Sequence, residues 1–178
     1  MPRSISRSLA AKLARVKIFL CDVDGVLTSA TVLIGDGREF KEFHIRDGLG
    51  LRLLQRTGIK VGWVSNRPST ATQQRADELK VDFLFQGKGS KVEAVETILE
   101  QAGFGWEDVC YMGDDVVDLG ALKRAGAAVA VANAIEEAKA LADYVTQLEG
   151  GRGAVREVVV LILKAQNKWR QLVLEYSA

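Results

Sequence analysis

Short apolar runs alternate along the chain with stretches that have the periodicity of amphipathic helices. Five runs rich in valine, isoleucine, alanine or aromatic residues are typical of buried strands: 16–21, 59–65, 82–85, 109–112 and 127–131. Strands that alternate with helices form a parallel sheet covered on both faces, with ligands at the carboxyl ends of the strands. We therefore predict an α/β fold, a Rossmann-like three-layer sandwich with a parallel sheet.

One segment interrupts this alternation. Residues 31–43 are predicted to form two short strands around a Gly-Asp-Gly turn, which makes a β-hairpin between the first strand and the first long helix. The length of 178 residues suits one sizeable core and is short for two. We predict a single domain over residues 1–178, with the hairpin at about 31–43 and a C-terminal tail and helix at about 150–170.

Two of the intervening helices have readable N-terminal signals. Ser69 is the predicted N-cap of a helix over residues 70–79, and Ser90 with Glu93 has the spacing of a capping box. Lysine at position 91 then stands at the start of a helix, where its charge opposes the helix dipole. A lysine in this unfavourable place favours a functional role over chance.

Charge and cysteine content limit the kinds of partner. The 24 Lys+Arg and 23 Asp+Glu give a net charge of +1, so no overall field attracts nucleic acid or an anionic membrane. Cys21 and Cys110 lie in apolar runs, which indicates buried thiols in a reducing compartment. No apolar run approaches the roughly 20 residues that span a bilayer. We predict a cytoplasmic protein that binds neither nucleic acid nor membrane.

Two carboxylates follow the first predicted strand directly. Asp22 and Asp24 stand at its carboxyl end, where a parallel sheet places ligands. A carboxylate such as Asp22 can attack phosphorus when a divalent cation and a basic side chain offset the charge of the phosphate. Asp24 could protonate the leaving oxygen and then accept a proton from water. The alternative is a solvated turn closed by Asx hydrogen bonds.

Polar residues also follow later strands. Ser65 and Asn66 come after the second strand and offer a hydroxyl and an amide to phosphate oxygens, although Ser65 could equally cap a helix. The segment 113–118, GDDVVD, follows another strand and offers Asp114 and its neighbours as oxygen ligands for Mg²⁺. The alternative there is an acid-rich helix start.

In this order the motifs resemble those of the haloacid dehalogenase superfamily of phosphohydrolases. The match comprises DVDGVLT (22–28), the serine of SNR (65–67), Lys91 and GDDVVD (113–118). The resemblance implies a haloacid dehalogenase-like fold in which Asp22 is the nucleophile and Asp24 the acid/base. It further implies that Ser65 and Lys91 secure the phosphoryl group.

The same resemblance implies a magnesium site. Mg²⁺ would be held by Asp22, the backbone carbonyl of Asp24, and Asp114. Whether Asp115 or Asp118 adds to this site is left open by the sequence.

The gaps between the motifs hold no cap domain, since the first contains only the hairpin and one helix. Capless members resemble the 3-deoxy-D-manno-octulosonate 8-phosphate (KDO 8-phosphate) phosphatases, in which hairpins from four subunits associate and close the sites. The resemblance implies a homotetramer that releases KDO and phosphate in lipopolysaccharide precursor synthesis. The alternative substrate is a nine-carbon ulosonate 9-phosphate, whose phosphatases usually have glutamate where Arg67 stands.

Closer similarity to this family lies in residues 41–54 and 143–158. Carried over by position, it implies the following substrate-binding residues: Asp24, His44, Ile45, Arg46, Asp47, Gly48, Arg52, Asn66, Arg67, Arg75, Lys91 and Arg152. Arginines suit the carboxylate and phosphate of a sugar acid phosphate. His44 and Asn66 depart from the family pattern, which leaves their roles open.

Some of these assignments have plain structural alternatives. Arg52 and Arg75 could belong to a solvated helix face. The glycine-rich tail at 150–153 resembles one that reaches an adjacent subunit's site, but it could also be a flexible connector to a final helix at 154–168.

Two other classes of protein share parts of this pattern. A response-regulator receiver also uses aspartates, a hydroxyl and a lysine, but its phosphoacceptor stands near the third strand, where this chain has none. A non-catalytic oligomerisation module could have lost the nucleophile Asp22 or Lys91, and both are present here. An active phosphatase is therefore the preferred interpretation.

Overall fold

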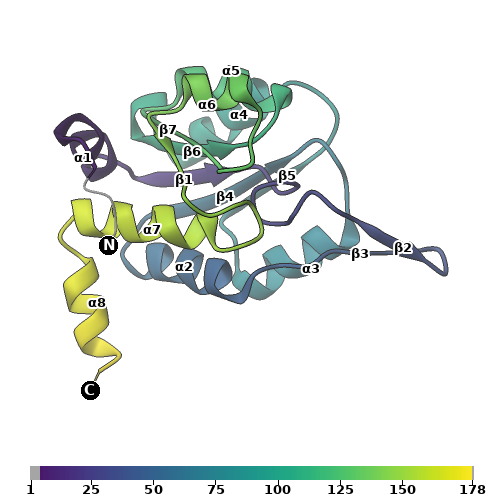
Figure 1. Cartoon of the computed structure of the whole chain (residues 1–178), viewed down its shortest axis with the longest axis horizontal. Helices are drawn as coiled ribbons and strands as arrows, with labels where there is room; N and C mark the ends of the chain where they lie inside the picture. The colour runs from purple at the N-terminus through teal and green to yellow at the C-terminus, as the bar shows by residue number, and fades with distance from the viewer. Residues whose placement is uncertain (1–4, 178) are drawn as a thin grey trace.

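The computed structural model describes residues 5–177 and contains a six-stranded parallel sheet between two layers of helices (Figure 1). The sheet strands are β1 (Ile18–Cys21), β4 (Lys60–Ser65), β5 (Phe83–Gln86), β6 (Val109–Gly113), β7 (Ala127–Ala130) and β8 (Tyr144–Val145). Their spatial order is β5-β4-β1-β6-β7-β8, and every neighbouring pair is parallel. The predicted α/β sandwich is confirmed, and only the two-residue edge strand β8 lacked a signal in the sequence.

Helices cover both faces of this sheet. They are α1 (Arg7–Ala14), α2 (Ile45–Arg56), α3 (Thr70–Leu79), α4 (Lys91–Ala102), α5 (Leu119–Arg124), α6 (Glu136–Leu141), α7 (Ala154–Ala165) and α8 (Trp169–Glu175). Helices α2, α3 and α7 lie on one face and α4, α5 and α6 on the other (Figure 1). Strands β1, β6 and β7 are buried along their whole length between these layers. Within residues 5–177, no helix has the length and apolar character needed to cross a bilayer.

The helix signals had mixed outcomes. Ser69 caps α3 as predicted, since its side chain accepts a hydrogen bond from Thr72 N at 3.3 Å. The capping box at Ser90 is wrong, because in the part of the chain that the structure describes the Ser90 side chain makes no cap hydrogen bond. The final helix is also shorter than predicted. It ends at Ala165, and Asn167 then takes a left-handed conformation with φ 58° that separates α7 from α8.

The predicted hairpin is present. Strands β2 (Leu33–Gly35) and β3 (Arg38–Phe40) pair antiparallel and project away from the main sheet (Figure 1). Asp36 and Gly37 both have positive φ, 50° and 71°, which matches the type I′ turn of tight hairpins. Between Asp22 and Lys91 the chain holds only the hairpin, two helices and two strands, so no cap domain is inserted there.

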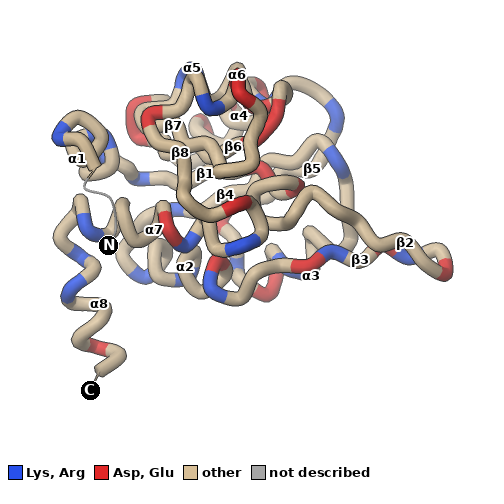
Figure 2. Tube along the Cα trace, in the orientation of Figure 1, with Lys and Arg blue, Asp and Glu red and all other residues tan. Residues whose placement is uncertain are grey.

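The strand order predicts where on the sheet a ligand binds. The chain runs from β1 outward to β4 and β5 on one side, then returns to β6, β7 and β8 on the other. Ligands of such sheets bind outside the carboxyl ends of the strands, where the order reverses. This point lies between β1 and β6, which are followed by Asp22 and Asp114. Acidic and basic positions are interspersed over the fold (Figure 2), in line with the near-zero net charge.

Candidate active site

Asp22 and Lys91 form a buried ion pair at the carboxyl end of β1. The Lys91 Nζ atom lies 2.6 Å from Asp22 Oδ2, and Asp22 Oδ1 accepts a hydrogen bond from Val23 N at 2.6 Å. Burial raises the pKa of Asp22 to about 6, although the ammonium of Lys91 opposes the rise. At pH 7 the carboxylate is therefore mainly ionised, as a nucleophile requires.

Asp118 holds Lys91 from the other side. Its side chain is fully buried, and Oδ1 lies 2.7 Å from both Lys91 Nζ and the Tyr111 hydroxyl. Its Oδ2 accepts hydrogen bonds from the backbone N–H groups of Asp114 and Asp115 at 3.0 and 3.3 Å. Burial opposes the charged form of Lys91, but Asp118 and Asp22 together raise its pKa above the ordinary value. The lysine therefore stays protonated and able to bind a phosphoryl group.

Asp114 completes a group of three carboxylates with Asp22 and Asp118, whose oxygens lie within 4.8 Å of one another. Burial raises the pKa of Asp114 to about 8, and the charges of Asp118 and Asp22 add to the rise. A divalent cation would offset this repulsion and favour the ionised form.

The residues fit such a cation. Oδ1 of Asp114 is buried and has no hydrogen-bond partner among residues 5–177, which suits a metal ligand. Gly25 allows the close approach, since a Cβ atom there would lie 2.0 Å from Asp114 Oδ2. The oxygens of Asp118 already accept hydrogen bonds from Lys91, Tyr111 and the backbone N–H groups of residues 114 and 115. Asp115 lies outside the carboxylate group. Asp22 and Asp114 stay the predicted carboxylate ligands for Mg²⁺.

Asp24 is paired with a residue that the sequence analysis passed over. Lys41, just after β3, places its Nζ atom 2.7 Å from Asp24 Oδ1 and 2.9 Å from Oδ2. The Lys41 side chain is fully buried, whereas the Asp24 side chain retains a quarter of its exposure. The hairpin therefore supplies a cation to the predicted acid/base.

Ser65 and Asn66 lie at the neighbouring strand end, after β4. Ser65 is buried, and its hydroxyl both accepts from Arg67 N and donates to Arg67 O, each at 3.1 Å. The Asn66 amide donates to Gly89 O at 2.9 Å and so joins this loop to the one before Lys91. This contact gives Asn66 a clear structural role in positioning the lysine loop. Its contact with substrate stays a prediction, as does that of Ser65.

The predicted substrate residues on α2 divide into separate groups. Gly48 faces Arg75, since a Cβ atom at position 48 would lie 2.5 Å from the Arg75 guanidinium. Arg75 in turn pairs with Glu78 at 2.6 Å. Arg52 instead donates to the carbonyl of Leu79 at the end of α3, 3.0 Å away. Arg75 lines a groove beside the hairpin, whereas Arg52 braces two helices, so neither lies on a simple solvated face.

Other predicted residues lie at the start of α2 and around α7. Asp47 is buried and accepts a hydrogen bond from Arg156 N at 2.7 Å, so it fixes the start of α7 against α2. Burial raises the pKa of Asp47. His44 Nδ1 lies 3.8 Å from Asp47 Oδ2, while Ile45 and Arg46 are exposed. The substrate contacts assigned to these four positions stay predictions.

The glycine-rich tail is packed against the active-site loop of its own chain. Gly150 and Gly151 are buried, and Gly151 N donates to Val26 O at 2.9 Å. A Cβ atom on Gly150 would lie 1.6 Å from the Gly25 carbonyl oxygen, so only glycine fits. The idea of a flexible connector is therefore wrong for these two glycines. Arg152 is exposed beside them, 3.4 Å from Glu42.

Three contributors to the site escaped the sequence analysis: Glu39, Lys41 and Tyr111. Glu39 joins the hairpin to the start of α3, through an ion pair with Arg67 and a 2.7 Å hydrogen bond from the Ser69 hydroxyl. The sequence did hold a signal for Glu39 and Lys41. Side chains alternate between the two faces of a strand, so positions 39 and 41 lie on the face of β3 opposite Phe40.

Comparisons of the sequence with known proteins identify its relatives. A family model described as haloacid dehalogenase-like hydrolase matches residues 83–158. The 3-deoxy-D-manno-octulosonate 8-phosphate phosphatase KdsC of Escherichia coli K12 is 38% identical over 165 residues, which covers 92% of this chain and 88% of that protein. KdsC of Yersinia pestis has the same identity and coverage.

Solved structures that are similar to this chain include phosphatases with the same substrate in their names. The Moraxella catarrhalis KDO 8-phosphate phosphatase, crystallised with a magnesium ion, a phosphate ion and KDO, is 37% identical with a TM-score of 0.92. That match covers 94% of this chain and 97% of the other. The cobalt-bound phosphatase YrbI of Haemophilus influenzae is 40% identical with a TM-score of 0.86, over 89% and 93% of the two chains.

Proposed function

Because the chain belongs to the haloacid dehalogenase-like hydrolases, in the family of the KDO 8-phosphate phosphatases, we propose that it hydrolyses KDO 8-phosphate. The products would be KDO and inorganic phosphate. The observation that carries the proposal is the pairing of Asp22 with Lys91, beside Asp114, at the carboxyl end of the central strand. This arrangement supports the roles of nucleophile for Asp22, phosphate-binding cation for Lys91 and metal ligand for Asp114.

The reaction proceeds in two steps on this chain's own residues. An oxygen of the Asp22 carboxylate attacks phosphorus, and the bond to the sugar oxygen breaks as Asp24 donates a proton to it. Water then attacks the aspartyl-phosphate while the Asp24 carboxylate accepts its proton, which releases phosphate and restores both side chains. Lys91 stays within reach of the phosphoryl oxygens because Asp118 and Tyr111 fix it.

Mg²⁺ is the proposed cofactor. Asp22, Asp114 and the backbone carbonyl of Asp24 would hold it. When bound, it offsets the negative charge of the phosphate that would otherwise repel Asp22. The buried, unsatisfied oxygen of Asp114 is the feature that fits this ion.

Phosphate release from a panel of substrates with Mg²⁺ tests the function. The panel holds KDO 8-phosphate, a nine-carbon ulosonate 9-phosphate and glucose 6-phosphate, which lacks the carboxylate. We expect the highest kcat/KM with KDO 8-phosphate, since Arg67 stands where the nine-carbon enzymes usually have glutamate. A preference for the nine-carbon substrate would establish the alternative, and no release from any of them would contradict both.

We propose that four copies assemble through the hairpin. It exposes Leu33, Ile34 and Phe40 at 69, 69 and 52% of their surface, and an isolated hairpin is marginal in water. Light scattering at micromolar concentration is expected to give about four times the 19.4 kDa chain mass. Ile34→Glu should lower this mass, whereas Val173→Glu, an exposed valine on α8, should not. A monomeric wild-type protein would refute the assembly.

We propose that Arg152 contacts the carboxylate end of the substrate, in its own site or in a neighbour's. Arg152→Ala should raise KM for KDO 8-phosphate about tenfold, because one charged hydrogen-bonding contact is lost. The small substrate p-nitrophenyl phosphate should be hydrolysed as before, since it has no carboxylate for Arg152. Arg170→Ala on α8 is the matched control. Equal KM values for the mutant and wild type with both substrates would leave Arg152 without this role.

We also propose that the protein is cytoplasmic and that its hydrolysis of KDO 8-phosphate belongs to lipopolysaccharide precursor synthesis. Both Cys21 and Cys110 are buried free thiols, which suits a reducing compartment.

A further inference from the structure

The ammonium of Lys41 lies in a buried polar site at the base of the hairpin. Besides both oxygens of Asp24, it contacts the Thr72 hydroxyl at 3.2 Å and Glu39 Oε1 at 3.8 Å. Removing an ammonium from water is costly unless anions and hydrogen bonds replace the water. The lysine is therefore held by specific partners rather than by general packing.

The position of Lys41 is also unfavourable for the helix next to it. Thr72 lies in the first turn of α3, and the N-terminal end of a helix favours negative charge. An apolar residue at position 41 would avoid both this repulsion and the desolvation. Lys91 stands in a similar place at the start of α4, and there the lysine serves the nucleophile.

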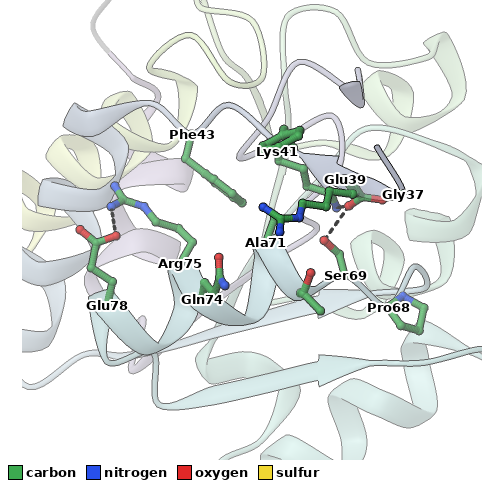
Figure 3. A pocket seen from close by; sticks show the side chains of 13 residues that line it. Gly37, Glu39, Lys41, Phe43, Pro68, Ser69, Ala71, Gln74, Arg75 and Glu78 are labelled. Carbon is green, nitrogen blue, oxygen red and sulfur yellow. Dashed lines mark hydrogen bonds and ion pairs between the residues drawn. The ribbon is translucent and has the colours of Figure 1, made fainter. Parts of the chain in front are cut away.

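Strand β3 is fixed in the orientation that delivers this lysine. Glu39 binds Ser69 and Arg67 at the loop before α3, and Figure 3 shows Glu39 and Lys41 side by side along a groove between the hairpin and α3. The groove encloses about 890 Å³. Phe40, between them in sequence, is half exposed. Glu39 and Lys41 are thus held on the side of the hairpin that meets the start of α3 and the active site.

We propose that Lys41 is a positioning residue for Asp24, so that the hairpin of each chain orients the acid/base of that chain. The inference rests on the proposed function and adds a residue to it. Lys41 holds the carboxylate of Asp24 in one rotamer through contacts to both oxygens. This keeps the carboxyl group aimed at the position of the leaving sugar oxygen.

Asp24 keeps the capacity for this transfer while bound to Lys41. Within the described part of the chain, Asp24 Oδ1 accepts no hydrogen bond, and its contact with Lys41 is an ion pair. A carboxyl oxygen has two lone pairs, so beside its contact with Lys41 it can carry the proton that passes to the leaving oxygen and that is later taken back from water. The proton that Asp24 gives up in the first step is regained from water in the second.

The identity of the leaving group tests the proposal. KDO 8-phosphate has an alkyl leaving group that needs the proton from Asp24, whereas p-nitrophenolate leaves without one. Lys41→Met should lower kcat for KDO 8-phosphate about 10- to 100-fold with little change in KM, which is part of the loss expected for an absent proton donor. Activity toward p-nitrophenyl phosphate should fall less than about threefold. Lys41→Arg should recover part of the lost rate.

Two further variants complete the experiment. Lys60→Met breaks an exposed 2.8 Å ion pair with Asp82 and should leave both activities unchanged. The double variant Asp24→Asn/Lys41→Met should be no slower than Asp24→Asn alone, because the two residues act as one unit. Equal losses with both substrates, or losses that multiply in the double variant, would overturn the proposal.

The result separates this inference from the proposed function. If Asp24→Asn itself does not distinguish the two substrates, the acid/base assignment fails. If Asp24→Asn does distinguish them and Lys41→Met does not, only the role of Lys41 fails. Melting temperature and light scattering of each variant show whether the hairpin remains folded and assembled.

Discussion

Replacement of Asp22 by asparagine is expected to abolish phosphate release while the fold is retained. The amide has the shape of the carboxylate but is a very weak nucleophile and a poor Mg²⁺ ligand. Loss of a nucleophile from an enzyme costs on the order of 10⁶ in kcat. Lys91 keeps Asp118 as an anionic partner at 2.7 Å, so its buried ammonium is not left uncompensated.

The measurement is phosphate release with KDO 8-phosphate and Mg²⁺, together with thermal unfolding. Acid-quenched wild-type protein should carry phosphate on Asp22 during turnover, and the variant should carry none. Asp77→Asn, which removes an exposed carboxylate from α3, is the control and should retain full activity. Near-wild-type turnover by Asp22→Asn would end the assignment of Asp22 as nucleophile.

Asp24→Asn is expected to lower kcat for KDO 8-phosphate by about 10²–10⁴, the range for loss of a general acid/base. The amide oxygen can still accept a hydrogen bond from Lys41, so the buried ammonium keeps a partner and the protein should fold. Mg²⁺ affinity should stay close to that of the wild type, because the proposed ligand at this position is a backbone carbonyl.

Calorimetric titration with Mg²⁺ shows whether the lower kcat of Asp24→Asn comes from lost acid/base catalysis or from weaker Mg²⁺ binding. Asp114→Asn is the matched comparison, since it removes a proposed side-chain ligand and should weaken Mg²⁺ binding strongly. A collapse of Mg²⁺ affinity in Asp24→Asn would show that the Asp24 side chain belongs to the metal site instead.

The strands and the main chemical residues were predictable because their signals are local. Apolar runs of four to seven residues between helical periods specified a parallel sheet, and this placed Asp22, Ser65 and Asp114 at one edge. The Asp36-Gly37 turn likewise specified the hairpin. Helix ends were harder to predict, because the break between α7 and α8 comes at Asn167, and asparagine is a weaker stop signal than glycine or proline.

Side-chain partnerships were decided only by the tertiary structure. Asp24 and Lys41 stand 17 positions apart, and Lys91 and Asp118 stand 27 apart, so no periodicity links them. Such contacts depend on where separate elements pack, and burial then selects the charges that pair. The same holds for Gly150, whose need for glycine comes from the Gly25 carbonyl far away in the sequence. The sequence by itself determined at which edge of the sheet the predicted site residues lie. The fold decided which neighbours hold them, because desolvation and close packing act only once distant segments meet.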